Sequence, residues 1–288
     1  MKWRDQRRSS NVDDRRASTG GGGISAGTIL FLFRLFGPLL RTKFGWAIIA
    51  LGVVAYLSGF NPLSLLGVGD TASRPVDQKK DDENAAFISA VLASTEDVWN
   101  RQLKGYREPT VVLYRGATQS GCGFASAQVG PFYCPADQKV YLDLGFFEEL
   151  ANTHNAPGDF AQAYVLAHEV GHHIQNLQGI LAKVQKAKQQ WGGESREANA
   201  LQVKVELQAD CYAGVWAYHA HKDFGMIEEG DVEEALNAAS AIGDDTLQRK
   251  AGRTVRPDAF THGSSAQRVE WFRRGFHTGD INACDTFR

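Results

Sequence analysis

The distribution of charged and apolar residues divides the chain into a polar N-terminal part, one long uncharged stretch and a mixed remainder. Residues 44–66 carry no charged side chain, and about 20 apolar residues are enough to cross the hydrocarbon core of a bilayer. Asn61-Pro62 interrupts this stretch near its end, because proline breaks a helix. We predict a single transmembrane anchor at 44–66; the alternative is a buried helix of a protein core.

Beyond the anchor, the apolar positions recur with the periods of helices and strands. Residues 67–84 are polar and predict a linker, whereas residues 85–288 predict one soluble domain. This domain would be α+β, mainly helical with a small β-sheet. Strands are expected at 109–114 and 139–143, and helices are expected at 85–105, 146–150, 159–190, 194–221, 231–242 and 265–275.

Charge is concentrated before the anchor. Residues 1–43 hold nine Lys and Arg against three Asp, so the positive-inside rule predicts a basic cytoplasmic tail and places the later domain outside. Polar composition and the run Gly20 to Gly23 predict that residues 1–28 of this tail are flexible. A cleavable signal peptide is less consistent with so long a basic region. Residues 29–40, which are apolar but interrupted by Arg34, would lie at the membrane surface.

Overall composition is that of a globular protein. The 288 residues are 43% hydrophobic and 22% charged, and the net charge is −2. A basic arm that binds nucleic acid is an alternative reading of residues 1–43, but the predicted anchor would separate it from the domain. We therefore expect no nucleic-acid partner.

Four cysteines, Cys122, Cys134, Cys211 and Cys284, occur in the predicted outer domain. An even number of cysteines in an oxidising compartment predicts disulfides, and four cysteines allow three pairings. Cys122 and Cys134 flank a short loop between strand-like segments, which favours that pair and leaves Cys211 with Cys284. A zinc site built from cysteines is the alternative, but the chain contains no Cys-x-x-Cys.

The motif that carries chemistry is His168-Glu169-x-x-His172. On a helix, His168 and His172 lie four residues apart on one face, so both imidazoles can reach one metal ion. Glu169 lies beside them, where a carboxylate can take a proton from a metal-bound water. The alternative is an accidental match on a helix that buries two histidines.

A catalytic zinc needs a third protein ligand and an open position. Gln175 and Gln178 stand where the metzincin pattern has Gly and His, which excludes that class. Further along, Glu206 and Asp210 share one helix face, so Glu206 can complete a His₂Glu set. Asp210 can then accept a hydrogen bond from the other nitrogen of a ligating histidine.

These residues carry a resemblance to known families. The pair of motifs at 168–172 and 206–210 resembles the gluzincin metallopeptidases, and Glu206-Leu-Gln-Ala-Asp210 is similar to the Glu-x-x-Ala-Asp of the CaaX-protease and HtpX-like group. Segments along nearly the whole chain resemble the bacterial YpfJ-type neutral zinc metallopeptidases. They are the opening MKWR, CPADQKVY at 134–141, LQADCYAGVW at 207–216 and THGSSAQRV at 261–269.

The resemblance implies roles residue by residue. His168, His172 and Glu206 would bind one zinc ion, Glu169 would be the general base, and Asp210 would orient His168. His262 would stabilise the oxyanion and Arg268 would support the local structure. Gly123, Phe124, Ala125, Ser126 and Ala127 would form an edge strand that pairs with the substrate. Val205 stands where thermolysin-type enzymes have Asn, so the partner of His172 is left unidentified.

The expected protein is therefore a zinc metallopeptidase of the endopeptidase type, with a peptide or protein substrate. It would be held in the bacterial inner membrane by one helix, with its N-terminus inside and its catalytic domain outside. The alternative is a membrane-anchored zinc protein that serves interactions and has little or no peptidase activity.

Overall fold

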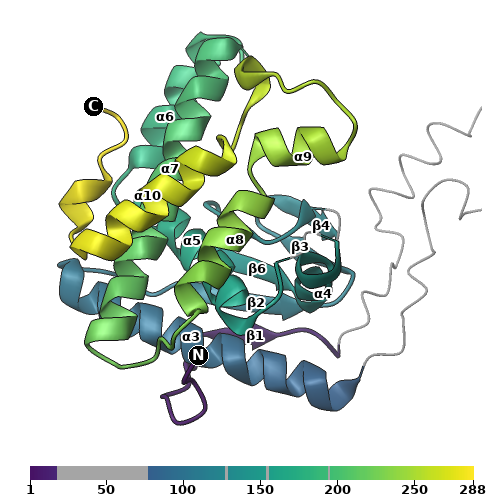
Figure 1. Ribbon diagram of the computed structural model, residues 1–288, viewed down its shortest axis with the longest axis vertical. Coiled ribbons are helices and arrows are strands. Elements are labelled where there is room, and N and C mark those ends of the chain that lie inside the picture. The colour runs from purple at the N-terminus through teal and green to yellow at the C-terminus, as the bar shows by residue number, and fades with distance from the viewer. Residues whose placement is uncertain (18–76, 127–128, 154–155, 194) are drawn as a thin grey trace, which may run out of the picture. The chain divides into compact units, whose positions relative to one another are not determined.

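The structure is a computed structural model, which describes residues 1–17, 77–126, 129–153, 156–193 and 195–288. Met1–Ala17 and Asp77–Arg288 form one compact unit of helices around a small sheet (Figure 1). The expected α+β class is confirmed for this unit. In the described ranges, no helix has the length and apolar character needed to span a membrane, and the anchor expected at 44–66 lies outside them.

Four strands form the central sheet, in the order β1-β2-β6-β5. β1, β2 and β6 are parallel, whereas β5 pairs antiparallel with β6 and is an edge strand. A separate antiparallel hairpin joins β3 and β4. The strand bounds are Val12–Asp14 (β1), Thr110–Tyr114 (β2), Ala117–Ser120 (β3), Gly123–Ser126 (β4), Phe132–Cys134 (β5) and Lys139–Asp143 (β6).

Eight α-helices and two short 3₁₀ helices lie in the described ranges. Their bounds are Gln78–Gln102 (α3), Leu144–Asn152 (α4), Asp159–Leu177 (α5), Ile180–Gln190 (α6), Arg196–Lys222 (α7), Asp231–Ala241 (α8), Asp244–Lys250 (α9), Pro257–Ala259 (η4), Ser265–Thr278 (α10) and Ile281–Cys284 (η5).

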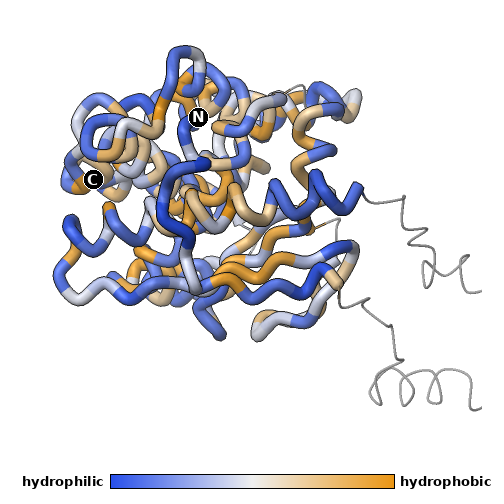
Figure 2. Tube along the Cα trace, turned by 90° about the horizontal axis from the view of Figure 1, so that it is seen from below, coloured by the Kyte–Doolittle hydropathy of each residue, from blue (hydrophilic) through white to orange (hydrophobic). Residues whose placement is uncertain are grey.

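Helix α5 lies at the centre of the unit, because it contacts β5 and β6 on one side and α7 and α8 on the other. Hydrophobic residues gather on the strands and on the inner sides of the helices, as Figure 2 shows. Helices α7 and α10 cross at two glycines. A Cβ at Gly214 would lie 2.1 Å from the Phe272 carbonyl oxygen, and one at Gly275 would lie 2.0 Å from that of Cys211. Only glycine permits such a close crossing.

Two predicted helix boundaries are wrong. The helix expected at 159–190 is interrupted after Leu177, because Gly179 adopts a left-handed conformation (φ 72°) and α6 begins beyond it. The helix expected at 85–105 begins earlier, at Gln78, where the Asp77 side chain accepts hydrogen bonds from two backbone N–H groups. The end of the expected linker at 67–84 is therefore helical.

The prediction of a flexible tail over residues 1–28 is wrong for residues 1–17. Strand β1 pairs with β2 in parallel, from Val12 opposite Val111 to Asp14 opposite Leu113. Trp3 is buried and its ring contacts Phe87 edge to face, with centroids 5.5 Å apart. The basic side chains that suggested a tail form ion pairs here, as Arg7 does with Glu96 and Arg16 with Asp81.

This packing also changes the expected topology. A single pass with residues 1–43 inside and residues 85–288 outside would put β1 and β2 on opposite sides of a membrane. Because the two strands share a sheet, the first 17 residues lie on the same side as the rest of the unit.

Both expected disulfides are confirmed, Cys122–Cys134 and Cys211–Cys284. Cys122–Cys134 ties the hairpin of β3 and β4 to the edge strand β5. Cys211–Cys284 ties α7 to η5 near the C-terminus and closes a sequence separation of 73 residues.

The role of the N-terminal segment can be tested by the substitution Trp3→Ala. We expect the free energy of unfolding to fall by about 3–5 kcal/mol, because a buried tryptophan leaves a large cavity. Urea unfolding of the purified full-length protein measures this change. The matched control is Trp191→Ala, since Trp191 is 46% exposed and should change stability by only about 0.5 kcal/mol. Equal effects of the two substitutions would contradict the packing of residues 1–17.

Candidate metal centre

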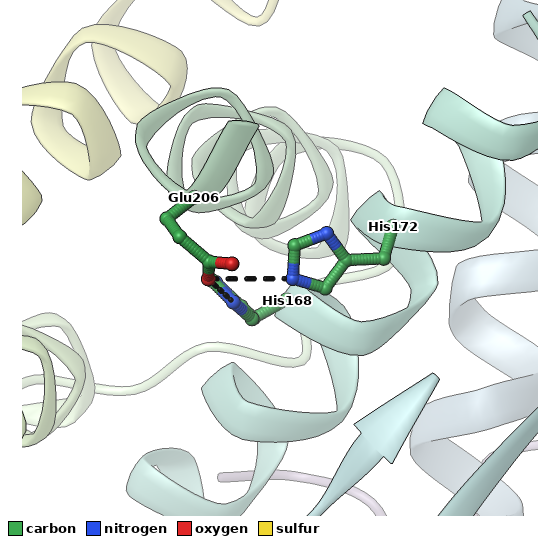
Figure 3. Close-up of side chains that lie close together, drawn as sticks. All are labelled: His168, His172 and Glu206. Carbon is green, nitrogen blue, oxygen red and sulfur yellow. Dashed lines mark hydrogen bonds and ion pairs between the residues drawn. The ribbon is translucent and has the colours of Figure 1, made fainter. Parts of the chain in front are cut away.

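Helix α5 presents the motif residues in the way its spacing predicts. His168 and His172 lie on one face, and their rings are 4.7 Å apart between centroids. The Nε2 atoms of both rings face Glu206 on α7, as Figure 3 shows. His168, Glu169 and Glu206 are all buried. The structure thus brings together, from two helices, the three residues expected to bind metal.

A glycine allows α5 and α7 to approach at this point. A Cβ at Gly171 would lie 3.0 Å from the Cα of Ala209 and 3.1 Å from its carbonyl oxygen. Gly171 immediately precedes His172, and Ala209 lies three residues after Glu206, which is one helical turn. The close contact between the two backbones therefore sets the distance between the histidines and the carboxylate.

The geometry of these three side chains fits a zinc ion. The Glu206 Oε2 atom lies 3.3 Å from Nε2 of His168 and 3.4 Å from Nε2 of His172. Ligands about 2.0–2.1 Å from a tetrahedral zinc lie about 3.3–3.4 Å from one another. The three ligand atoms are all within 4.8 Å of each other. Three protein ligands leave a fourth position for water or substrate, as in catalytic zinc sites.

The buried carboxylate of Asp210 orients His168. The Nδ1–H group of His168 donates to Asp210 Oδ1 at 2.8 Å, so Nε2 is the nitrogen that faces Glu206 and can bind metal once it has lost its proton. Arg268 donates from Nε and Nη2 to the two carboxylate oxygens at 2.8 and 2.9 Å. Tyr164 donates its hydroxyl to the same Oδ1 atom. Asp210 therefore joins side chains from α5, α7 and α10.

Gln175 orients His172 in the same manner. Nδ1–H of His172 donates to Gln175 Oε1 at 2.8 Å. The side chain of Gln175 is fully buried, and its amide donates to the Val205 carbonyl at 2.7 Å and to Gln208. The partner of His172, which the sequence left unidentified, is thus a glutamine on the same helix, three residues away.

The electrostatics of the site favour a bound cation. Burial alone would raise the pKa of Glu206, but His172 and His168 hold it well below its ordinary value. Burial lowers the pKa of His168, but Asp210 and Glu206 raise it to about 9. Burial would raise the pKa of Asp210, but Arg268 and His168 lower it to about 2. Without a metal, the carboxylates are charged and hold protons on the histidines, and a zinc ion would replace those protons.

The metal-binding side chains lie in a cavity of about 1110 Å³. Glu169 also lines this cavity, and among the described residues no side chain or backbone group donates a hydrogen bond to its carboxylate. The carboxylate is therefore free to accept a proton from a molecule that enters the cavity.

His262 lines the same cavity from the other side and is held by Asp244. Oδ2 of Asp244 accepts hydrogen bonds from the backbone N–H groups of Thr261, His262 and Gly263, at 2.7, 2.6 and 3.1 Å. The Nδ1–H group of His262 donates to Asp244 Oδ1 at 3.3 Å. This hydrogen bond raises the pKa of His262 and leaves Nε2 available for a ligand.

The expected substrate strand is present as a strand. Residues 123–126 form β4, which pairs with β3 and, in the described part of the chain, is not among the residues that line the cavity; Ala127 lies outside the described residues, and a role in substrate pairing stays a prediction. The strand that does line the cavity is β5, through Phe132 and Tyr133.

Three residues of the site were not predicted. Tyr164 and Gln175 carry a local signal, since they lie four residues before His168 and three residues after His172 and therefore share the face of the motif. Asp244 carries none, because it precedes His262 by 18 residues and begins a separate helix.

Comparison with known proteins gives a family and two kinds of relative. The family described as "Putative neutral zinc metallopeptidase" matches residues 1–287. The uncharacterized protein YpfJ of Escherichia coli (strain K12) is 45% identical over 299 residues, which cover 100% of this chain and 99% of YpfJ. The uncharacterized protein Rv2575 of Mycobacterium tuberculosis (strain H37Rv) is 45% identical over 210 residues, or 69% of either chain. No solved structure matches the chain significantly.

Replacement of Gln175 by Leu tests the orientation of His172. We expect zinc affinity to fall about tenfold to a hundredfold, because partners that orient a ligand contribute that much to metal binding. Competition with a chelating dye measures the affinity. Gln185→Leu is the matched control, because Gln185 lines the cavity and, within the described ranges, forms no hydrogen bond to a zinc-binding side chain. Unchanged affinity in a folded Gln175→Leu protein would show that His172 needs no such partner.

Proposed function

The chain belongs to the neutral zinc metallopeptidase family that its sequence matches, and we propose that it is a zinc-dependent endopeptidase. The observation that carries the proposal is the arrangement of two histidines and one glutamate at zinc distances, with a second, unbonded glutamate beside them. One zinc ion per chain would be held by His168, His172 and Glu206. When bound, zinc acts as a Lewis acid that polarises the scissile carbonyl and activates a water molecule.

Glu169 is the proposed general base. Its carboxylate lines the cavity next to both histidines and, in the described part of the chain, has no hydrogen-bond partner to hold it elsewhere. It would take one proton from the attacking water and deliver it to the nitrogen of the leaving amine, which balances the hydrolysis of one peptide bond.

His262 is proposed to stabilise the oxygen of the scissile carbonyl, which gains negative charge during attack. Asp244 fixes both the backbone and the ring of His262 at the edge of the cavity, so its Nε2 group would need little further ordering. Preorganised donors of this kind contribute to catalysis because they need not reorient during the reaction. Arg268 acts indirectly, because it neutralises Asp210 and is fully engaged there.

We propose β5, in place of the segment 123–127, as the strand that pairs with the substrate. β5 is the edge of the sheet beside α5, and its residues line the cavity. Edge strands present unpaired backbone groups, to which an extended peptide can add as a further strand.

The alternative, a zinc protein that only mediates interactions, is less well supported. A structural zinc site usually has four protein ligands and is closed. Here three ligands converge at a wide cavity, and a free carboxylate lies where a base is needed.

We further propose that the folded unit lies outside the cytoplasm and that the chain between residues 18 and 76 attaches it to the membrane. The two disulfides favour an oxidising compartment. Because both ends of this intervening segment join one folded unit, the chain must return to the side from which it enters the membrane.

Glu169→Gln tests the mechanism. We expect the variant to retain zinc, measured by elemental analysis, and to lose peptide hydrolysis by about 10²- to 10⁴-fold, because proton transfer contributes that much. Glu206→Ala should instead lose the zinc itself. The matched control is Glu197→Gln, an exposed glutamate at the start of α7, which should change neither property. Unchanged hydrolysis by Glu169→Gln would favour a different base or no peptidase function.

Single cysteines test the topology. Ser10→Cys and Glu229→Cys place thiols at exposed positions before and after the proposed membrane segment. We expect a membrane-impermeant maleimide added to intact cells to label both equally. Labelling of only one would contradict a shared side, and labelling of both only after permeabilisation would place the unit in the cytoplasm.

A further inference from the structure

The walls of the metal cavity are mainly apolar beyond the zinc-binding residues. They come from three parts of the fold, namely the approach to β5, helix α4 and helix α6. The main contributors are Val129, Pro131, Phe132, Phe146, Leu181 and Val184. Glu169, Glu206 and Arg268, described above, also line the cavity. Apart from them and the histidines, Glu149 is the one charged residue of the wall in the described part of the chain. A volume of about 1110 Å³ exceeds that of most small-molecule sites and can hold several side chains.

Two strongly exposed apolar side chains lie at the cavity or on an element bonded to its wall. In the described ranges, only three large hydrophobic side chains are strongly exposed, namely Phe124 at 65%, Val129 at 56% and Trp191 at 46%. Val129 belongs to the cavity wall. Phe124 lies on β4, two residues beyond Cys122, which is bonded to Cys134 of β5 with the Cα atoms 5.8 Å apart. Two of the three exposed side chains therefore lie at the cavity or on the hairpin tied to its wall, where a soluble protein would otherwise favour polar residues.

The backbone of the cavity wall favours an extended ligand. Among the described residues, β5 pairs with β6 on one side only, so its other edge can pair with a peptide strand. In an extended peptide, alternate side chains point to the same face. Several apolar side chains of one peptide can thus contact the wall.

We propose that this site binds extended polypeptide segments rich in large apolar residues such as Leu and Phe, and that Phe124 and Val129 are specificity-determining residues. The inference rests on the proposed peptidase function and names its substrate class. Large apolar side chains would be buried against the apolar part of this wall, whereas charged side chains would lose hydration there. Because folded proteins bury their apolar segments, the substrates would be unfolded or unassembled polypeptides.

The experiment compares two fluorescent peptides of equal length, which carry Leu and Phe or Ser and Lys on both sides of the central bond. Binding is measured by anisotropy with full-length Glu169→Gln protein loaded with zinc, and turnover is measured with the unsubstituted protein. We expect the apolar peptide to bind about tenfold to a hundredfold more tightly, as burial of one or two large apolar side chains allows.

Substitutions then locate the binding surface. Phe124→Asp and Val129→Asp, each combined with Glu169→Gln, should weaken binding of the apolar peptide at least fivefold and reduce the preference for it. The matched control is Trp191→Asp, which introduces the same charge at an exposed apolar side chain outside the cavity and should leave both quantities unchanged.

The outcomes separate this inference from the peptidase function. If the unsubstituted protein cleaves peptides but both peptides bind equally, the substrate class is wrong and the peptidase function stands. If the apolar peptide is preferred but no peptide is cleaved, the substrate class stands and the peptidase function is wrong. Unchanged binding by Phe124→Asp and Val129→Asp would overturn their role in specificity.

Discussion

The carboxylate of Asp210 is the interaction on which the site depends. It accepts hydrogen bonds from Tyr164 and His168 on α5 and from Arg268 on α10, while it is itself carried by α7. A charge buried this deeply is costly unless it is paired and fully hydrogen-bonded, and here Arg268 supplies the pair. Three helices can therefore satisfy this group only in one relative position. That position also places Glu206, one turn before Asp210, beside the two histidines.

The same constraint explains the glycines at the helix contacts. Gly171 lets α5 approach α7 at the metal-binding residues, and Gly214 and Gly275 let α7 approach α10 just beyond Asp210. A methyl group at any of these positions would separate the helices by enough to break hydrogen bonds of about 2.8 Å. The site is thus positioned by backbone contacts, and the polar network sets the rotation of each side chain.

The sequence predicted those parts of the site that follow from helical spacing. His168 with His172 and Glu206 with Asp210 each lie four residues apart, so each pair shares a face wherever the helices pack. Asp244 could not be predicted in this way, since its contact with His262 depends on how a loop folds back over α9. β1 was missed for a related reason: it has three residues, and its partner β2 lies about 100 positions away. The local composition of residues 1–17 favoured a flexible tail, but the pairing of β1 with β2 determines their structure.

The two disulfides hold two parts of the site: one lies beside Asp210, and the other lies at the surface that a substrate would contact. Cys211 directly follows Asp210, so its bond to Cys284 holds α7 at the point where the three helices share the carboxylate. Cys122–Cys134 holds an otherwise separate two-stranded hairpin, which is marginally stable alone, against the edge strand of the cavity. One disulfide therefore fixes helix α7, which carries Glu206 and Asp210, and the other fixes the hairpin that carries Phe124. A hairpin that is already held in place loses little conformational entropy when an extended peptide binds. The apolar cavity wall can then select its ligand by the burial of apolar side chains alone.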